Sequence, residues 1–220
     1  MQPSDLSALG SQNPFLQQCS EETRATLGSY GQLRSFTGNE LLFRDGDPAG
    51  VVLFPLSGSL QMSKTDAHER RQVICNVEPR KCNGICILLL ADHGLADVHG
   101  VEPGQVLILG RQEFQRLARQ DQLACQMGWQ AVIECMKHLA DLVESLSFHT
   151  VARRVALTLL RSTEKDGDLV RITQSELAAE VGTTREVVAR CLAGLRRAGA
   201  VKLGRARITV LSREKLQQES

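Results

Sequence analysis

The sequence lacks any apolar run approaching the roughly 20 residues that a membrane-spanning helix requires. Its first residues also lack the basic start and apolar core of a secretory signal peptide. We therefore expect a cytoplasmic protein with no membrane partner, in which the seven cysteines stay largely reduced. At 220 residues the chain is long enough for one or two domains with proper cores.

The chain also has little net charge, +1 at pH 7, but this balance hides an asymmetry. Residues 151–213 carry thirteen Lys and Arg against six Asp and Glu, whereas residues 1–150 carry twelve against seventeen. A basic C-terminal part behind a mildly acidic N-terminal part indicates nucleic-acid binding confined to one end of the chain.

Residues 172–200 have the pattern of two short helices. Thr173 and Glu176 have the spacing of a capping box, and Gly182 can take the positive φ angle that ends a helix. Residues 183–186 repeat the capping-box spacing and open a second helix, whose apolar positions recur at helical spacing: Val187, Val188, Leu192 and Leu195. Two short helices joined by a turn that contains glycine predict a helix-turn-helix.

The second of these helices begins with long polar side chains, where a recognition helix meets base edges in the major groove. Arginine can pair with guanine O6 and N7, and a glutamate can accept from a cytosine amino group. Threonines at the helix start suit phosphate contacts. Residues 200–210 predict two short strands about a glycine turn, a wing whose basic side chains face a DNA backbone. The predicted DNA-contacting residues are Thr183, Thr184, Arg185, Glu186 and Arg190.

The N-terminal half has a different character. Between residues 31 and 109, short apolar runs alternate with Gly, Asp, Asn and Pro, a pattern typical of a β-sandwich or barrel. Two of the predicted turns are residues 45–48 and 56–59.

Residues 111–148 predict one long helix in which Gly128 is only a weak interruption. Its apolar positions alternate by three and four, which is the seam of a coiled coil, and the simplest partner for it is a second copy of the chain. The predicted seam is Cys125, Gly128, Val132, Cys135, Leu139, Leu142 and Leu146. In the alternative interpretation the helix packs on its own β domain through Leu123, Met127, Trp129 and Met136.

The order of β-roll, long helix and winged helix-turn-helix resembles the CRP/FNR family of bacterial transcription regulators. Four stretches carry the resemblance: Phe43-x-x-Gly46-Asp47, residues 56–60 (LSGSL), residues 146–156 (LSFHTVARRVA) and residues 182–190 (GTTREVVAR). It implies an α+β fold with a jelly-roll-like, cyclic-nucleotide-binding-like sensor in residues 1–110. It further implies a dimerisation helix in residues 111–148 and a DNA-binding domain in residues 149–220.

The resemblance also implies partners. Arg185, Glu186 and Arg190 match the base-reading positions of the cyclic-AMP-receptor branch, whose half-sites are TGTGA-like. We therefore expect a homodimer on palindromic double-stranded DNA, with RNA polymerase as a further partner. This protein would be a regulator and not an enzyme.

The sensor part departs from the pattern of cyclic-nucleotide-binding members. Gly84 stands where such members carry a ribose-binding glutamate, and Gly94 where they carry a phosphate-binding arginine. Without a cation, a buried phosphate would stay unpaired, at a cost of several kcal/mol. We therefore do not expect cyclic AMP as the effector.

The same stretch holds candidate ligands for another signal. Thiolates and imidazoles suit soft metals and haem iron, and Cys82 beside two basic residues suits a reactive thiol. Three sensors remain open: a redox or soft-metal sensor through Cys82 and Cys86, a haem protein with a Cys and a His as axial ligands, or a pocket for an uncharged ligand or none. The candidate residues are Cys75, Cys82, Cys86, His93 and His99.

Two other classes of function are alternatives. One is a metal-dependent cupin-like enzyme with an appended DNA-binding module, its metal held by Asp92, His93 and His99. The other is an architectural DNA binder with a degenerate sensor domain.

Overall fold

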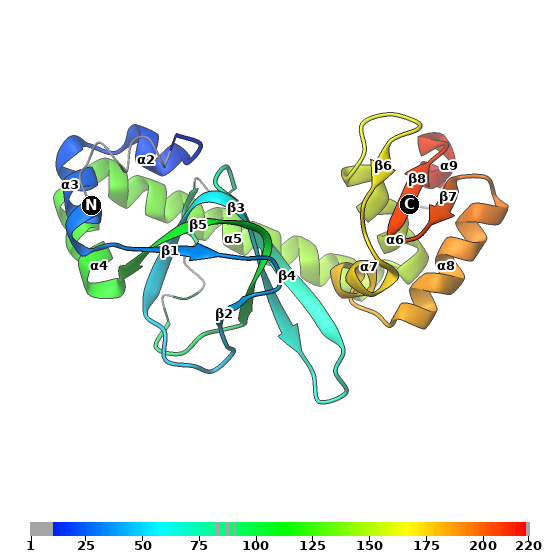
Figure 1. Ribbon diagram of the computed structural model, residues 1–220, viewed down its shortest axis with the longest axis horizontal. Coiled ribbons are helices and arrows are strands. Elements are labelled where there is room, and N and C mark those ends of the chain that lie inside the picture. Colours follow the sequence, from blue (N-terminus) through cyan, green and yellow to red (C-terminus); the bar gives the residue numbers. More distant parts are fainter. Residues whose placement is uncertain (1–10, 82–83, 87–88, 90, 219–220) are drawn as a thin grey trace. The chain divides into compact units, whose positions relative to one another are not determined.

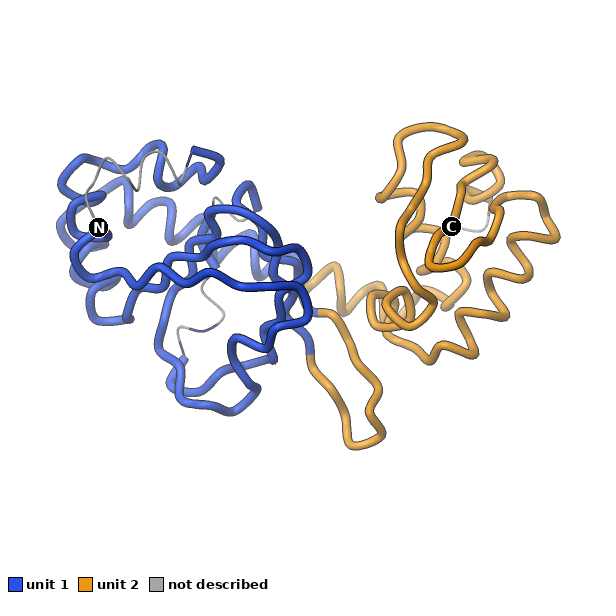
Figure 2. Tube along the Cα trace, viewed as in Figure 1, with its two compact units in different colours: residues 1–63, 74–139 blue, residues 64–73, 140–220 orange. Residues whose placement is uncertain are grey.

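The computed structural model describes residues 11–81, 84–86, 89 and 91–218. The chain divides into two compact units (Figure 2). The first comprises residues 1–63 and 74–139, and the second comprises residues 64–73 and 140–220. The boundaries between them fall inside the strands β3 Val51–Thr65 and β4 Arg71–Val77 and inside the helix α5 Gln122–Phe148.

The first unit is built on an antiparallel sheet with the strand order β1-β5-β3-β4, and β2 pairs with β5 beside this path (Figure 1). The predicted α+β class with an N-terminal β domain is confirmed. The strand bounds are β1 Gln32–Phe36, β2 Leu41–Phe43, β3 Val51–Thr65, β4 Arg71–Val77 and β5 Asp97–Gly110.

One predicted turn is wrong. Residues 56–59 lie inside the continuous strand β3, where the register with β5 shifts between Pro55 and Leu60. A β-bulge uses glycine for the same conformational reason as a turn does. Gly58 has φ +68°, and a Cβ there would lie 2.5 Å from the Pro103 carbonyl oxygen. The predicted turn at residues 45–48 is confirmed, with Gly46 at φ +82°.

Helices cover one part of this sheet: α2 Pro14–Gln18, α3 Glu21–Tyr30, α4 Arg111–Gln120 and the first part of α5 Gln122–Phe148. They share a core with the strands around Phe54, whose ring centroid lies 5.1 Å from that of Phe15 and 6.3 Å from that of Phe114. Ala124, Met127 and Ala131 bring α5 into the same cluster. A second cluster fills the roll; it includes Leu53, Leu60, Met62, Cys86, Leu89, Val98 and Val106.

The prediction of a single long helix over residues 111–148 is also wrong in one respect. This segment forms two helices, α4 and α5, which are separated at Asp121, and Gly128 does not interrupt α5. The Asp121 carboxylate accepts hydrogen bonds from the backbone N–H groups of Leu123 and Ala124, at 2.9 and 3.2 Å, and thereby caps α5. It also accepts from the hydroxyls of Ser20 (3.0 Å) and Thr23 (2.5 Å), which joins α3 to the helix start.

The second unit contains four helices and a small antiparallel sheet with the order β6-β8-β7. Its core lies where α6, α7 and α8 meet the sheet and α9. The bounds are α6 Val151–Arg161, β6 Leu169–Val170, α7 Gln174–Val181, α8 Arg185–Arg197, β7 Val201–Gly204, β8 Arg207–Val210 and α9 Arg213–Gln218.

The hairpin β7–β8 is the predicted wing, but its turn differs from the prediction. Arg205 and Ala206 form the turn, and Ala206 adopts φ +52°, the conformation expected of a glycine. Gly204 is the last residue of β7 and pairs with Arg207. The two strands are therefore in place, and the basic side chains Arg205 and Arg207 flank their tip.

Because Asp121 caps α5 and ties it to α3, Asp121→Ala should lower the free energy of unfolding by about 0.5–2 kcal/mol. Burial raises the pKa of the Asp121 carboxyl. Hydrogen bonds from Thr23, Ala124, Ser20 and Leu123 together lower it by more than burial raises it, so the net shift is downward. The stability that the ionised Asp121 carboxylate contributes is therefore fully present above its unfolded-state pKa. It is lost as the pH falls through the folded-state pKa.

Thermal unfolding followed by circular dichroism at neutral and at acidic pH checks this prediction. The difference between wild type and Asp121→Ala should shrink on acidification, and the exposed control Asp141→Asn should match wild type. A difference that is the same at both pH values would refute the role of the ionised carboxylate.

Candidate nucleic-acid interface

Helix α7 begins and ends as its sequence predicts. The Thr173 hydroxyl accepts from the Glu176 N–H at 3.1 Å, and the Glu176 carboxylate accepts from the Thr173 N–H at 2.7 Å. This is the complete capping box. Gly182 ends the helix in the left-handed conformation, with φ +66°.

Helix α8 begins differently from the prediction, because no capping box forms between Thr183 and Glu186. Thr184 is the N-cap, and its side chain makes no capping hydrogen bond. The Glu186 carboxylate instead accepts from its own backbone N–H and from the Thr184 hydroxyl, and these bonds lower the pKa of Glu186. Glu186 is thus held as an anion beside Arg185 at the start of the helix.

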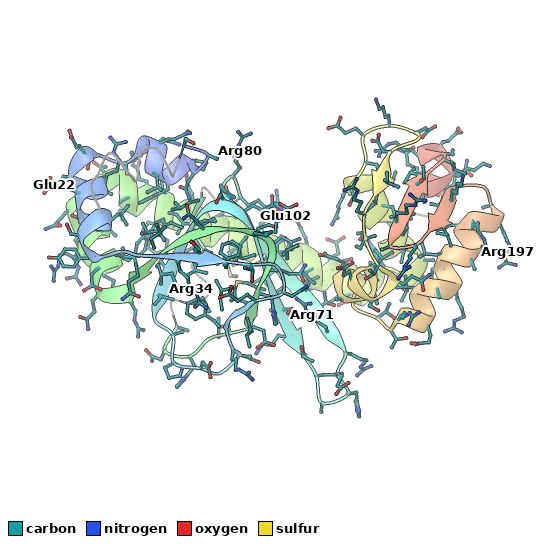
Figure 3. All side chains as sticks on the ribbon, viewed as in Figure 1. Glu22, Arg34, Arg71, Arg80, Glu102 and Arg197 are labelled. Atoms are coloured by element: carbon teal, nitrogen blue, oxygen red, sulfur yellow. The ribbon has the colours of Figure 1, made fainter. Side chains whose placement is uncertain are left out.

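Burial divides α8 into two faces. Val188, Leu192 and Leu195 are buried in the core of the unit, whereas Arg185, Glu186 and Arg190 are exposed. Glu186 and Arg190 are four residues apart and lie on the same side of the helix. Arg197 in the last turn is also exposed (Figure 3). The predicted base readers therefore share the accessible side of the helix, while Thr183 and Thr184 are half-buried at its start.

A pocket of about 300 Å³ lies between the start of α7, the start of α8 and the wing. Helix α7 contributes backbone N–H groups that have no partner within the helix and the positive end of its dipole. Exposed arginines from α8 and from the wing surround this helix start, so the pocket combines features that attract a phosphate group. Its lining includes Thr173, Gln174, Ser175, Arg185, Arg205 and Arg207.

Arg154 of α6 is a positioning residue that the sequence reasoning missed. One guanidinium nitrogen donates to the backbone carbonyls of Ser145, Leu146 and His149 at 3.2–3.4 Å, at the end of α5. The other donates to the carbonyl of Gly182 at 3.4 Å, in the turn before α8. Burial lowers the pKa of Arg154. This side chain therefore ties the end of the long helix to the turn of the helix-turn-helix.

Not every basic residue of this unit serves an interface. Arg213 donates to the carbonyls of Leu160 and Thr163 and to the Thr163 hydroxyl, so it fastens α9 to the end of α6. Lys215 donates to the Ala198 carbonyl at 2.8 Å and thereby caps the end of α8. Arg154 and Arg213 are among the thirteen basic residues of positions 151–213, so that count overstates the charge available to DNA.

Cys191 lies on α8 beside Arg190, and its side chain packs against the core of the unit. Burial raises the pKa of its thiol. Since the thiolate is the reactive form, the raised pKa makes this thiol less reactive at neutral pH than an unperturbed one.

The sensor candidates lie in separate places. Cys82 falls outside the described residues. Cys86 is buried in the core of the roll, with its sulfur 3.6 Å from that of Met62. His93 is exposed and forms a β-bridge with Pro48, and His99 lies in β5 opposite Leu41 and Gln61.

The described candidates Cys75, Cys86, His93 and His99 do not assemble a metal site of the usual size. Within the described part of the chain, no three or more His, Cys, Asp or Glu side chains are grouped so that they could hold a metal ion. The candidate Cys75 is half-buried in β4, against the cluster that contains Cys86. Asp92, which the cupin-like alternative needs as a ligand, forms an ion pair with Arg111 at 2.5 Å.

Gly84 and Gly94, on which the expectation against cyclic AMP rests, are both in close contact with the chain itself. A Cβ at Gly84 would lie 2.3 Å from the side-chain oxygen of Asn13. A Cβ at Gly94 would lie 2.8 Å from the Arg44 carbonyl oxygen, and the Gly94 N–H donates to Asp47 at 2.8 Å. Neither position has room for a longer side chain without rearrangement.

Helix α5 exposes an apolar stripe that lies beside the predicted seam. Trp129, Ile133, Met136 and Val143 are each more than 60 % exposed. The alternative in which Trp129 and Met136 pack on the β domain is therefore wrong, although Met127 and Leu123 do so. Of the predicted seam, Cys125, Val132, Cys135, Leu139 and Leu142 are half-buried, and Leu146 is 40 % exposed.

A search of the described helices finds none with the length and apolarity that crossing a bilayer requires.

Comparison with known proteins agrees with both units. Residues 33–121 match the family model of the cyclic nucleotide-binding domain, and residues 153–219 match that of the Crp-like helix-turn-helix domain. A cyclic AMP receptor protein of Thermus thermophilus is 30 % identical over 184 residues, which cover 83 % of this chain and 85 % of that protein.

Solved structures share the fold. A CRP/FNR-family regulator from Eubacterium rectale superposes with a TM-score of 0.78 at 18 % identity, covering 95 % of this chain and 98 % of that one. FixK2 from Bradyrhizobium japonicum gives a TM-score of 0.70 at 21 % identity, with 86 % and 97 % covered. The β-roll followed by a winged helix-turn-helix is thus the fold of these regulators, and with the extent of the Thermus match it establishes that this chain belongs to the CRP/FNR family of DNA-binding transcription regulators.

Proposed function

We propose that this protein regulates transcription as a homodimer on a palindromic DNA site, and that it responds to a thiol signal at residues 82–86, here called the sensor loop. The observation that carries the DNA-binding part is the exposed side of α8, with Arg185, Glu186 and Arg190 at its start. The pocket between the starts of α7 and α8 and the wing would bind a phosphate of the DNA backbone, and this contact would orient α8 on the duplex.

Each base-reading side chain has a defined partner chemistry. Arg185 and Arg190 match the two acceptors of guanine, and the ionised Glu186 matches the amino group of cytosine. This set suits the G and C positions of TGTGA-like half-sites. Thr183 joins the backbone contacts at the helix start, while the Thr184 hydroxyl is engaged by Glu186.

The exposed apolar stripe of α5 supports the dimer. Four large apolar side chains recur along one side of a 27-residue helix, at spacings of three, four and seven. Such a stripe, about 21 Å along the helix, is unfavourable in water and is buried when a second α5 packs against it. The interface we propose combines this stripe with the half-buried seam that includes Val132, Cys135, Leu139 and Leu142. RNA polymerase as a further partner is proposed from the family resemblance.

The sensing part of the proposal is a thiol switch rather than cyclic AMP. A bound phosphate would meet the Gly94 main chain in place of a cation, at a cost of several kcal/mol. A haem with Cys86 as axial ligand would displace the core in which Cys86 and Leu89 are buried. The chemistry that we propose is a disulfide between Cys82 and Cys86, in which two thiols lose two protons and two electrons to an oxidant.

The DNA-reading role is tested with a pair of arginine variants. Arg185→Ala should cost about 1–3 kcal/mol on the cognate palindrome and should relax base preference at one position of the half-site. Arg207→Ala in the wing should instead weaken binding about equally for all sequences and reduce the salt slope by about one. Fluorescence anisotropy against a panel of single-base variants of the duplex measures both. If Arg185→Ala weakened every duplex equally, its base-reading role would be wrong.

The sensing role is tested by adding cyclic AMP and the thiol oxidant diamide, which takes up the hydrogens of both thiols. Diamide should change the affinity for the palindrome by a factor of about 5–150, whereas cyclic AMP should leave that affinity unchanged. Cys82→Ser and Cys86→Ser should each abolish the response to diamide, and the control Cys125→Ser should keep it. A response to cyclic AMP, or a diamide response that survives Cys86→Ser, would contradict the proposed switch while leaving DNA binding untouched.

A further inference from the structure

The Asn13 side chain joins the N-terminal segment to two distant parts of the roll. It is completely buried. Its amide nitrogen donates to the Pro55 carbonyl in β3 and to the Gly84 carbonyl in the sensor loop, both at 2.8 Å. Its side-chain oxygen accepts from the Leu16 N–H at 3.1 Å and caps α2. All of these bonds are sheltered from water, so losing them leaves buried carbonyl groups unpaired.

The fit between Asn13 and Gly84 leaves no space. Gly84 has φ +76°, and an added Cβ would lie within 2.6 Å of three Asn13 side-chain atoms. The loop can therefore approach Asn13 only because it has glycine at this position. Movement of the loop main chain at Gly84 away from Asn13 breaks the amide contact.

The contact is continuous with the core that holds α5. Ile85, the residue after Gly84, is 1 % exposed and belongs to the same cluster as Phe15 and Leu16 of α2. That cluster also contains Phe114 of α4 and Ala124, Met127 and Ala131 of α5. Because protein cores are close-packed, a shift of Ile85 and α2 must be taken up by these neighbours.

We propose that Asn13 acts as a latch: it fastens α2 to the sensor loop, and release of this contact transmits a change at the loop to α5. The proposal rests on the assignment of this loop as the sensor. A disulfide or other modification that draws the loop at Gly84 away from Asn13 removes both amide bonds and unseats Phe15 and Leu16. The buried side of α5 then loses part of its support, and α5 carries the helix face assigned to the dimer.

Asn13→Ser is the decisive variant, since serine is also a good N-cap but its side chain is too short to reach both carbonyls. Gly84→Ala disrupts the same contact from the loop, because the added Cβ clashes with the Asn13 side chain. Gln18→Ser, at an exposed position of α2, is the matched control. Hydrogen exchange by mass spectrometry on the full chain, without DNA or effector, follows three segments: residues 14–19, 84–86 and 124–131.

In Asn13→Ser and in Gly84→Ala, exchange should rise about 5- to 30-fold in all three segments together, and Gln18→Ser should match wild type. Faster exchange in residues 14–19 alone would overturn the proposal, because Asn13 would then be only a helix cap. Equal acceleration throughout the chain, residues 174–197 included, would overturn it as well, since Asn13 would then support the whole fold. A failure of the proposed DNA-binding function would be seen in a separate measurement, because the wild-type protein would then bind palindromic duplex no better than other duplexes.

Discussion

The function of this protein depends on how firmly α8 is held by the core beneath it. Val188 and Leu192 are fully buried and Leu195 nearly so, against side chains of α6, α7 and the small sheet. Burying each leucine or valine contributes about 1.5–3 kcal/mol, whereas an exposed ion pair contributes about 1 kcal/mol or less. The apolar face therefore fixes the rotation of α8 about its axis. Arg185, Glu186 and Arg190 point outward as a consequence, with no partner needed to hold them there.

Features set by neighbours in sequence were predictable, and features set by distant residues were not. The capping box at Thr173 and the left-handed Gly182 depend on a few adjacent residues, and both are present. The expected box at Thr183 failed because the helix begins one residue later, where the Glu186 carboxylate turns back to its own N–H and to Thr184. Gly58 was read as a turn because bulges and turns use glycine alike, and only the partner strand β5 distinguishes them.

The residues that tie elements together gave no signal in the sequence. Asp121, Arg154 and Arg213 act on groups that are mostly far along the chain, and their types are common on any protein surface. Asn13 is the strongest example, since its partners are 42 and 71 residues away. Gly84 and Gly94, on which the expectation against cyclic AMP rests, were visible in the sequence. The contact between Gly84 and Asn13 could be found only in the structure. There, a glycine that looked like a missing ligand residue packs against another part of the chain.

The central claim is that two copies of α8 read successive major grooves on one face of the duplex. Its most direct test is the affinity for a palindrome whose half-sites are moved apart by five base pairs, about half a helical turn. We expect the affinity to fall to that of a single half-site, because the second recognition helix then faces the wrong side of the DNA. The same affinity for both spacings, with one chain bound per half-site, would contradict the account.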